Sequence, residues 1–273
     1  MASKKKIEQF KKTVWGHYRE NRRDFLWRHN INPYRVLVSE IMLQQTQVSR
    51  GEIKYKEFLK KFPNFKALAG ASNADVLEAW QGLGYNRRAL YLKKTAEVVT
   101  KEYKGKLPDT PELLVKLPGI GVYTAGAVCA FAFNKPVVFI DTNVRRVFIH
   151  HFFNDREGVT DGELAPLVEA ALDKENAREW YSALMDYGSM LGLKEENANK
   201  RSAHYVKQSK FEGSLRQVRG RILKIVVRSR KHVTKETLSE ILGETKDRVD
   251  LAVAGLERDG LVLISRKQIR LSE

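Results

Sequence analysis

Apolar residues recur at three- and four-residue spacing along most of the chain, which is the pattern of amphipathic helices. The spacing predicts helices over 7–19, 34–48, 51–62, 74–81, 87–103, 111–117, 122–133, 142–153, 163–172 and 176–191. Pro or Gly marks the breaks between them, as at Asn32-Pro33 and at Pro118-Gly119-Ile120-Gly121. An all-α fold is therefore expected up to about residue 213.

The pattern changes in residues 214–273, where strand-like alternation follows two helical segments. The helix RQVRGRILKIVVRS comes first, and Thr234 is expected to cap KETLSEIL, which ends at Gly243. A third helix, DRVDLAVAGLERDG, precedes LVLIS and KQIRL, which flank a predicted hairpin turn. Helix, helix–turn–helix and β wing predict a small winged helix, a module that serves either DNA binding or protein docking.

The strongly basic composition indicates which kind of molecule the protein binds. The 273 residues carry a formal net charge of +16, with a sequence pI near 9.8. Residues 1–32 hold nine Lys and Arg against three Asp and Glu, and residues 214–273 hold fourteen against eight. Basic charge spread along the chain favours a polyanion such as nucleic acid, and the alternative is a basic protein without such a partner.

Cysteine usage and hydropathy exclude several classes. Cys129, the single cysteine, lies in an apolar segment and predicts core packing, so one chain offers no disulfide framework and no four-cysteine zinc or iron–sulfur site. The N-terminal MASKKKIEQFKK has no apolar h-region, so we expect no secretory signal. Apolar runs are too short for a membrane span. We expect a cytoplasmic, nucleoid-associated protein.

A lone carboxylate in VLVSEIMLQQTQV is the first candidate for chemistry. On a helix, Glu40 shares a face with Val36, Leu37, Leu43 and Gln44. Burial beside aliphatic groups disfavours the charged form, so the pKa of Glu40 should rise towards neutrality. A carboxyl that is protonated near pH 7 can act as a general acid. The alternative is a buried glutamate paired with a neighbouring arginine.

Two further stretches suit a negatively charged polymer and a cationic intermediate. In LPGIGVYTAGA, Gly119 and Gly121 allow a tight turn, and the N–H groups that open the helix at Val122 can bind a phosphate. Helix hairpins of this kind also occur purely for packing. Asp141 follows the apolar run VVFI and is expected to cap a helix from Thr142, where backbone N–H groups favour its anionic form. A capping role alone is the alternative.

Several ordered motifs together resemble the helix–hairpin–helix (HhH-GPD) superfamily of DNA glycosylases, and in particular the adenine DNA glycosylase (MutY) family. The resemblance covers about residues 20–192 and rests on LWR, PYRVLVSEIMLQQTQV, FPNFKALA, VLEAWQGLGY, LPGIGVYTAGA, DTNVRRV and ALMDYGSM. It implies a glycosylase core over 1–213 made of two α-helical lobes. One lobe would span about 33–143, the other would combine 1–32 with 144–213, and DNA would lie across the cleft between them.

The resemblance also implies catalytic roles. Glu40 would protonate N7 of a flipped-out adenine, and Asp141 would stabilise or transiently bond the sugar cation at C1′, with Asn143 orienting it. Tyr123 occupies the position at which strand-cutting relatives of the endonuclease III type carry a lysine that forms a Schiff base. Because tyrosine cannot do so, we expect a monofunctional glycosylase.

Other residues would meet the DNA. By resemblance, Gln44 and Gln45 enter the minor groove beside the emptied position, while Trp27 and Arg28 form the wall of the adenine pocket. Tyr85 corresponds to a wedging tyrosine, and Asn86 stands where most family members have a second tyrosine. The pattern around Asn86 is more similar to that of relatives that remove thymine or uracil, so it favours thymine or uracil as the alternative substrate base.

Two family features are expected to be missing. By family spacing, the iron–sulfur ligands would fall near Gly192, Asn199, Ser202 and Gln208, none of them cysteine. The nudix-like C-terminal domain is replaced by the winged helix of 214–273. No soluble cofactor is implied, although hairpin carbonyls could hold Na⁺ or K⁺.

The sequence thus predicts a monomeric base excision repair enzyme that acts on double-stranded DNA and removes adenine mispaired with guanine or 8-oxoguanine. One alternative is a glycosylase for thymine or uracil in G·T and G·U mismatches. Another is a non-catalytic winged-helix DNA-binding protein.

Overall fold

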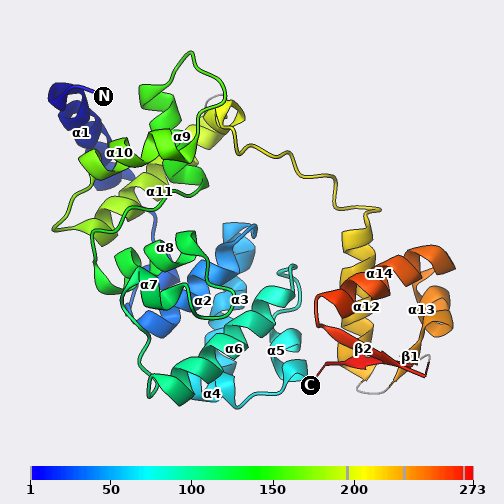
Figure 1. Ribbon diagram of the computed structural model, residues 1–273. Helices are drawn as coiled ribbons and strands as arrows, with labels where there is room; N and C mark the ends of the chain where they lie inside the picture. The colour runs from blue at the N-terminus through cyan, green and yellow to red at the C-terminus, as the bar shows by residue number, and fades with distance from the viewer. Residues whose placement is uncertain (1, 195–196, 230–231, 267, 273) are drawn as a thin grey trace. The chain divides into compact units, whose positions relative to one another are not determined.

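The computed structural model describes residues 2–194, 197–229, 232–266 and 268–272, and it is predominantly helical, which confirms the predicted all-α class with a small C-terminal sheet (Figure 1). The chain forms two compact units. Unit 1 combines Met1–Glu40 with Leu107–Lys207, and unit 2 combines Ile41–Lys106 with Gln208–Glu273. The helix α2 (Pro33–Leu43) contains the boundary between Glu40 and Ile41. The functional division predicted from the sequence, with a core of 1–213 and lobes of 33–143 and 1–32 with 144–213, stays a prediction.

Unit 1 is built around the buried faces of five helices: α1 (Lys4–Asn21), α8 (Val122–Phe133), α9 (Thr142–Phe152), α10 (Asp161–Ala171) and α11 (Ala177–Lys194). Aromatic rings fill its centre, where the Phe10 and Phe148 centroids lie 5.0 Å apart and Trp180 is fully buried. The unit also holds the short segments η1 (Leu26–Arg28), α7 (Pro111–Leu114) and η2 (Ala198–Arg201). This core fixes the N-termini of α8 and α9.

Unit 2 contains a second helical layer formed by α3 (Val48–Lys61), α4 (Phe65–Ala69), α5 (Asn73–Ala79) and α6 (Arg87–Glu102). Its largest buried side chain is Trp80, whose indole N–H donates to the carbonyl of Gly84 at 3.2 Å. Phe58 packs edge-on against that ring at a centroid distance of 5.7 Å. The loop after α5 is therefore tied to the core of the unit.

The rest of unit 2 has the predicted winged-helix elements: α12 (Leu215–Ser229), α13 (Lys235–Leu242), α14 (Lys246–Arg258) and the hairpin of β2 (Val262–Ser265) and β3 (Gln268–Leu271), drawn orange to red in Figure 1. Thr234 caps α13 through its side chain, and Gly243 ends the helix in the left-handed conformation. A short strand β1 (Val233–Thr234), which the sequence did not reveal, completes an antiparallel sheet of order β1-β3-β2.

Two predicted helices were wrong in their extent. The expected helix of 34–48 ends at Leu43, and α3 begins only at Val48. Gln45 lies between them with φ +53°, in the left-handed region that a continuous helix does not allow. The helix expected over 111–117 likewise ends at Leu114, because the chain turns early towards the glycines of the hairpin.

Candidate active site

Glu40 lies near the C-terminal end of α2 and faces the start of α8. Its carboxyl accepts a hydrogen bond from the Tyr123 hydroxyl at 3.2 Å. Burial raises the pKa of Glu40 to about 7, the Tyr123 hydrogen bond opposes that rise, and the nearby charge of Asp141 adds to it. The residue keeps part of its surface accessible. A carboxyl in this state carries a proton at neutral pH for part of the time and can deliver it to a bound group.

Asp141 is the N-cap of α9, as the sequence predicts. One carboxylate oxygen accepts from the backbone N–H of Val144 at 2.6 Å, and the other accepts from Asn143 Nδ2 at 3.1 Å. The capping hydrogen bonds favour the anionic form as predicted, but burial is the larger effect and raises the pKa of Asp141 above its usual value. Hydrogen bonds from Val144 and Asn143, together with the charge of Arg145, act against that rise.

The two carboxyl groups have unlike surroundings, which separates their roles. Glu40 receives one hydroxyl donor, whereas Asp141 receives amide donors at both oxygens. The anion of Asp141 is therefore better solvated by the protein, and a proton held by the pair resides on Glu40. An acid and a fixed anion within one site can together support the departure of a leaving group from a carbon that becomes cationic.

Tyr123, the second residue of α8, remains a neutral hydrogen-bond donor. Burial, followed by the charges of Glu40 and Asp141, raises the pKa of its hydroxyl well above the ordinary value. Its ring packs edge-on against Phe139 at a centroid distance of 5.8 Å. The side chain therefore supplies a proton-bearing oxygen beside Glu40 and no amine.

Asn143 is held in place by contacts that the sequence did not reveal. Arg146 donates to Asn143 Oδ1 at 3.3 Å and to the Gly188 carbonyl at 2.6 Å, which fixes the amide so that its nitrogen faces Asp141. A Cβ on Gly188 would lie 2.8 Å from the Asn143 carbonyl oxygen, so α11 can approach α9 only with glycine there. The spacing of Asn143 and Arg146 on one helix face was the available signal.

The hairpin before α8 has the geometry that phosphate binding requires. Gly119 adopts φ +75°, and Gly121 is the N-cap of α8 with no side-chain cap hydrogen bond. Val122, the first residue of the helix, is 80% exposed. The opening N–H groups of α8 are thus accessible to an anion. Phosphate binding by these three residues stays a prediction.

Trp27 and Arg28 lie together in η1, and their contacts differ in kind. The Arg28 guanidinium forms a two-pronged ion pair with the fully buried carboxylate of Asp186, with both distances 2.8 Å. Trp27 stacks on Phe25 at a centroid distance of 4.8 Å. Arg28 therefore anchors η1 to α11, while the predicted place of both residues in a base pocket remains untested.

The predicted DNA-facing side chains of unit 2 lie on two loops. Gln44 and Gln45 follow α2, and Tyr85 and Asn86 precede α6, where Asn86 is the N-cap. Gln45 and Tyr85 both have positive φ, +53° and +46°. A further contact joins these two loops, and the sequence pattern did not predict it.

That contact comes from the segment before α12. Gln208 Nε2 lies 2.8 Å from Gln45 Oε1 and 2.9 Å from the Tyr85 hydroxyl, and Arg216 also donates to that hydroxyl at 3.0 Å. The two predicted DNA-facing side chains are thus brought together by Gln208.

The positions expected for iron–sulfur ligands have other contacts. Asn199 donates to the Thr142 carbonyl at 3.0 Å, and Gly192 lies against the Arg146 guanidinium. None of the four side chains is a thiol, so they do not fit a cluster held by cysteines. Across the described residues, no three His, Cys, Asp or Glu side chains gather as a metal site. Among the helices described, none is long and apolar enough to cross a membrane.

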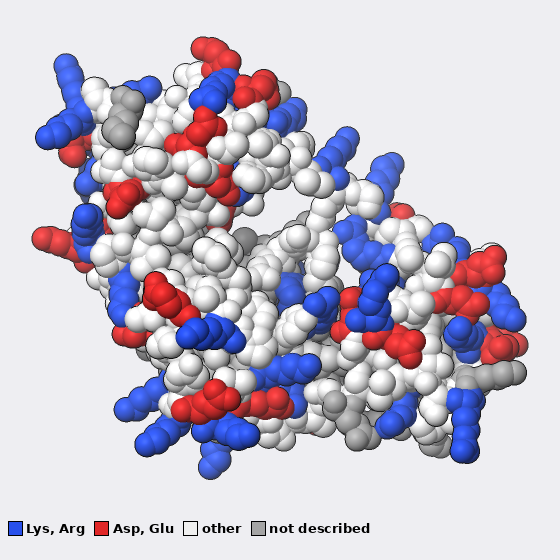
Figure 2. Space-filling view, viewed as in Figure 1, with Lys and Arg blue, Asp and Glu red and all other residues white. Residues whose placement is uncertain are grey.

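Charge on the visible surface is mixed. Figure 2 shows Lys and Arg interspersed with Asp and Glu over both units, without one dominant basic patch on that face. The third helix of the winged module, α14, carries three basic and three acidic residues and exposes Leu251. Its composition favours the docking alternative over insertion into a DNA groove.

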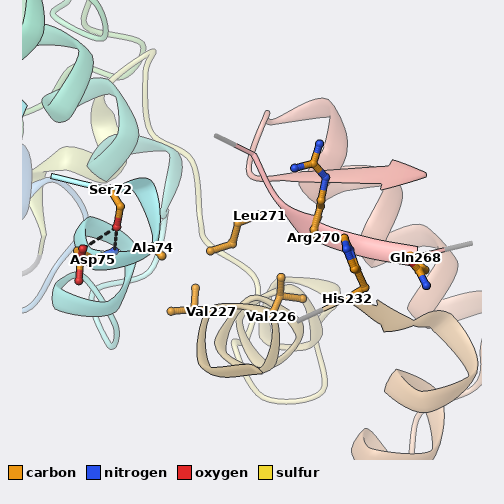
Figure 3. A pocket seen from close by; sticks show the side chains of 9 residues that line it. All are labelled: Ser72, Ala74, Asp75, Val226, Val227, His232, Gln268, Arg270 and Leu271. Carbon is orange, nitrogen blue, oxygen red and sulfur yellow. Dashed lines mark hydrogen bonds between the residues drawn. The ribbon is translucent and has the colours of Figure 1, made fainter. Parts of the chain in front are cut away.

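An open cavity of about 800 Å³ lies elsewhere in unit 2 (Figure 3). Both apolar and polar side chains line it, and the lining residues are Ser72, Ala74, Asp75, Val226, Val227, His232, Gln268, Arg270 and Leu271. Among them, Ser72 caps α5 and donates to Asp75 at 2.6 Å. No residue predicted to act in chemistry or DNA contact lines this cavity.

Comparisons with known proteins place the chain in a family. Residues 38–169 match the HhH-GPD superfamily of base excision DNA repair proteins. The chain is 34% identical to an adenine DNA glycosylase of Mycolicibacterium smegmatis over 90% of this chain and 89% of that protein. It is 31% identical to a thymine/uracil-DNA glycosylase of Methanothermobacter thermautotrophicus, over 70% and 87% respectively.

Solved structures agree as well. A thermostable thymine-DNA glycosylase matches with a TM-score of 0.63 at 28% identity, covering 71% of this chain and 91% of that one. Endonuclease III in a trapped covalent intermediate with DNA matches at 0.59 and 20% identity, covering 70% and 88%, which shows a shared fold. The chain therefore belongs to the HhH-GPD superfamily of base excision DNA repair proteins.

Proposed function

We propose that this protein is a monofunctional DNA glycosylase that removes adenine mispaired with guanine or 8-oxoguanine in double-stranded DNA. The observation that carries the proposal is the pairing of a Glu40 carboxyl, whose pKa burial raises to about 7, with the capped carboxylate of Asp141. The similarity to adenine DNA glycosylases over nine-tenths of the chain supports adenine as the base.

The reaction follows from the two carboxyl groups. Glu40 gives its proton to N7 of the extruded adenine, so that the electron pair of the breaking C1′–N9 bond is drawn into the base. The anion of Asp141 stabilises the cationic sugar. Water then adds to C1′ and loses a proton, and uptake of one proton restores the acid form of Glu40. General acid catalysis supplies on the order of 10² to 10⁴ in rate. Electrostatic stabilisation by Asp141, oriented by Asn143, accounts for much of the remainder.

Strand cleavage should be absent or weak because Tyr123 supplies no amine to form a Schiff base with the sugar. The test is borohydride treatment of the enzyme with a DNA substrate during turnover. We expect no trapped enzyme–DNA adduct under conditions in which a lysine-bearing relative is trapped. Efficient trapping would overturn the monofunctional mechanism.

A second candidate is removal of thymine or uracil from mismatches with guanine. It is favoured by Asn86 and by the likeness to the thymine-DNA glycosylase structure. A single-turnover panel with adenine, thymine or uracil opposite guanine and 8-oxoguanine separates the two. Release of adenine alone supports the leading proposal, and adenine left intact in every duplex would end it.

Glu40→Gln tests whether the site is catalytic at all. The amide keeps the shape of the side chain but cannot donate an acidic proton, so adenine release should fall by about 10² or more. An unchanged rate would favour the non-catalytic winged-helix reading. Glu179→Gln, which alters a glutamate bonded to Tyr18, is the matched control and should leave the rate unchanged.

We propose further that the enzyme works without an iron–sulfur cluster, as a monomer in the cytoplasm at the nucleoid. The residues at the expected ligand positions support the first point. Iron analysis of the purified protein tests it, and stoichiometric iron would contradict it. A Na⁺ or K⁺ ion at the hairpin carbonyls would appear as a dependence of DNA affinity on the identity of the monovalent cation.

A further inference from the structure

Arg88, the second residue of α6, inserts its guanidinium between two loops of unit 2. All three of its nitrogens donate hydrogen bonds, and every acceptor except the Thr46 hydroxyl is a backbone carbonyl. No Asp or Glu among the described residues pairs with it. This cation is therefore committed to the backbone and not to an ion pair.

The first set of acceptors is the end of α2. Arg88 Nη1 lies 2.7 Å from the Ile41 carbonyl and 3.3 Å from that of Met42, and it also donates to the Gln44 carbonyl. The last carbonyls of a helix have no partner within it, and they form the negative end of its dipole. A cation at this point satisfies them where the helix ends at Leu43, two residues before Gln45.

The second set is the loop that carries Tyr85. Arg88 Nη2 donates to the Leu83 and Gly84 carbonyls at 3.3 and 3.1 Å, and Nε donates to the Tyr85 carbonyl at 3.4 Å. The guanidinium also lies over two rings, 5.4 Å from the centroid of buried Trp80 and 5.6 Å from that of Tyr85. One rigid, planar group thus fixes both loops against the core of the unit.

Each loop contains one residue whose backbone conformation is unfavourable without support from its surroundings. Gln45 and Tyr85 have left-handed φ values without being glycine, and such residues persist only where their surroundings hold them. Burial lowers the pKa of Arg88 to about 10, which still leaves the group charged at neutral pH. The positive charge and the fork of donors are both available to hold the two loops.

We propose that Arg88 is a positioning residue that holds Gln45 and Tyr85 in register, so that both side chains enter the duplex together when the adenine is extruded. The inference rests on the proposed function. It differs from a simple structural role, because it assigns Arg88 to the separation of the base pair and not to the chemistry at Glu40.

The experiment compares Arg88→Lys with Arg87→Lys on two substrates. Lysine keeps the charge but lacks the planar fork of donors. Arg87 is the neighbouring arginine, bonded to Tyr91, and lies outside the proposed machinery. One substrate holds adenine opposite guanine. The other holds adenine opposite an abasic-site analogue, so that no base pair has to be broken before the adenine leaves the duplex. Single-turnover base release and far-ultraviolet circular dichroism are measured for each protein.

For Arg88→Lys we expect release from the paired adenine to fall by about 10- to 100-fold, and release from the unpartnered adenine by less than about threefold. Arg87→Lys should match the parent on both. Equal losses on the two substrates by a natively folded Arg88→Lys protein, or no loss on either, would overturn the inference.

A second variant, Thr46→Val, keeps the proposal testable if Arg88→Lys folds poorly, because it removes only the hydroxyl that accepts from Arg88 Nη2 at 3.4 Å. It should slow release from the paired adenine and leave release from the unpartnered adenine unchanged. Equal effects on the two substrates, or no effect on either, would count against the proposal. If the parent protein releases no adenine from either substrate, the proposed function fails instead, and the two failures are thereby distinguished.

Discussion

Replacing Tyr123 with phenylalanine should move the pH dependence of the reaction upward. The Tyr123 hydroxyl donates a hydrogen bond to Glu40 at 3.2 Å, and that bond stabilises the charged carboxylate. It therefore lowers the pKa of Glu40, against the larger effect of burial, which brings the pKa to about 7. Without the hydroxyl, burial and the Asp141 charge act unopposed, so the pKa of Glu40 rises above 7.

The size of the shift follows from the length of the bond. A hydrogen bond to a charged group contributes about 1.5 to 3 kcal/mol. At 3.2 Å the Tyr123–Glu40 bond is longer than the usual O–H···O separation, so the lower end applies. About 1.4 kcal/mol corresponds to roughly one pKa unit. The acid form, required for catalysis, should then persist to about pH 8 in the variant.

The assay is single-turnover adenine release from a G·A duplex between pH 5.5 and 9.5, a range that brackets both midpoints by more than about one pKa unit. Activity of the parent should decline as pH rises through about 7, where Glu40 loses its proton. The midpoint in Tyr123→Phe should lie about one unit higher. Tyr18→Phe removes a similar tyrosine–glutamate bond, to Glu179 at 2.6 Å, and should leave the midpoint unchanged. An unmoved or lowered midpoint in Tyr123→Phe would refute the reasoning.

Three further outcomes are expected. Glu40→Gln should stabilise the fold at high pH. Because burial raises the pKa of Glu40 in the folded protein, its protonated form stabilises the fold below about pH 4.5, and this stabilisation is lost as the pH rises through about 7. The free energy of unfolding of the variant in urea should therefore exceed that of the parent by at most about 3 kcal/mol at pH 8 and by nothing at pH 4. Gly188→Ala should reduce both base release and stability, the latter by about 1 to 3 kcal/mol in thermal unfolding, since its Cβ would lie 2.8 Å from the Asn143 carbonyl oxygen. Gly16→Ala, with open space around its Cβ, is the control and should be neutral or stabilising in the same assay. Exchanging exposed Leu251 and Ala254 of α14 for glutamate should leave duplex affinity unchanged in a fluorescence anisotropy titration, and a loss of about tenfold or more would show that α14 contacts DNA.

Helix positions could be predicted from the sequence wherever a cap or a glycine marks the end. Asp141 and Thr234 cap helices as predicted, and Gly243 ends α13 as predicted. The failure at 34–48 has a tertiary cause. Nothing local to Gln45 requires a left-handed conformation, and the carbonyls that end α2 are satisfied by Arg88, more than forty residues further along the chain.

Some residues of the candidate site could likewise be predicted from local sequence, and others could not. Glu40 could be recognised because a lone carboxylate interrupts an apolar helix face, and Asp141 because it follows an apolar run at a helix start. The spacing of Asn143 and Arg146 on α9 was a local signal, but the contacts of Arg146 with Gly188 and of Gln208 with Tyr85 join distant segments, so periodicity and spacing could not reveal them. The effect of capping on Asp141 could be predicted because capping is local and visible in the sequence, whereas the burial that outweighs it depends on the packing of the whole unit.

The distribution of unfavourable features argues for catalysis over a purely structural or DNA-binding role. Glu40 is desolvated next to a second carboxylate, although glutamine would fill the same space without that penalty. Gln45 and Tyr85 occupy left-handed conformations where glycine or asparagine would relieve the strain. A protein that only bound DNA would be more stable without either feature. These costly features lie at the residues that we expect to protonate the base and to separate the base pair. Such a loss of stability at functional residues is expected of an active site and not of a surface that only binds DNA.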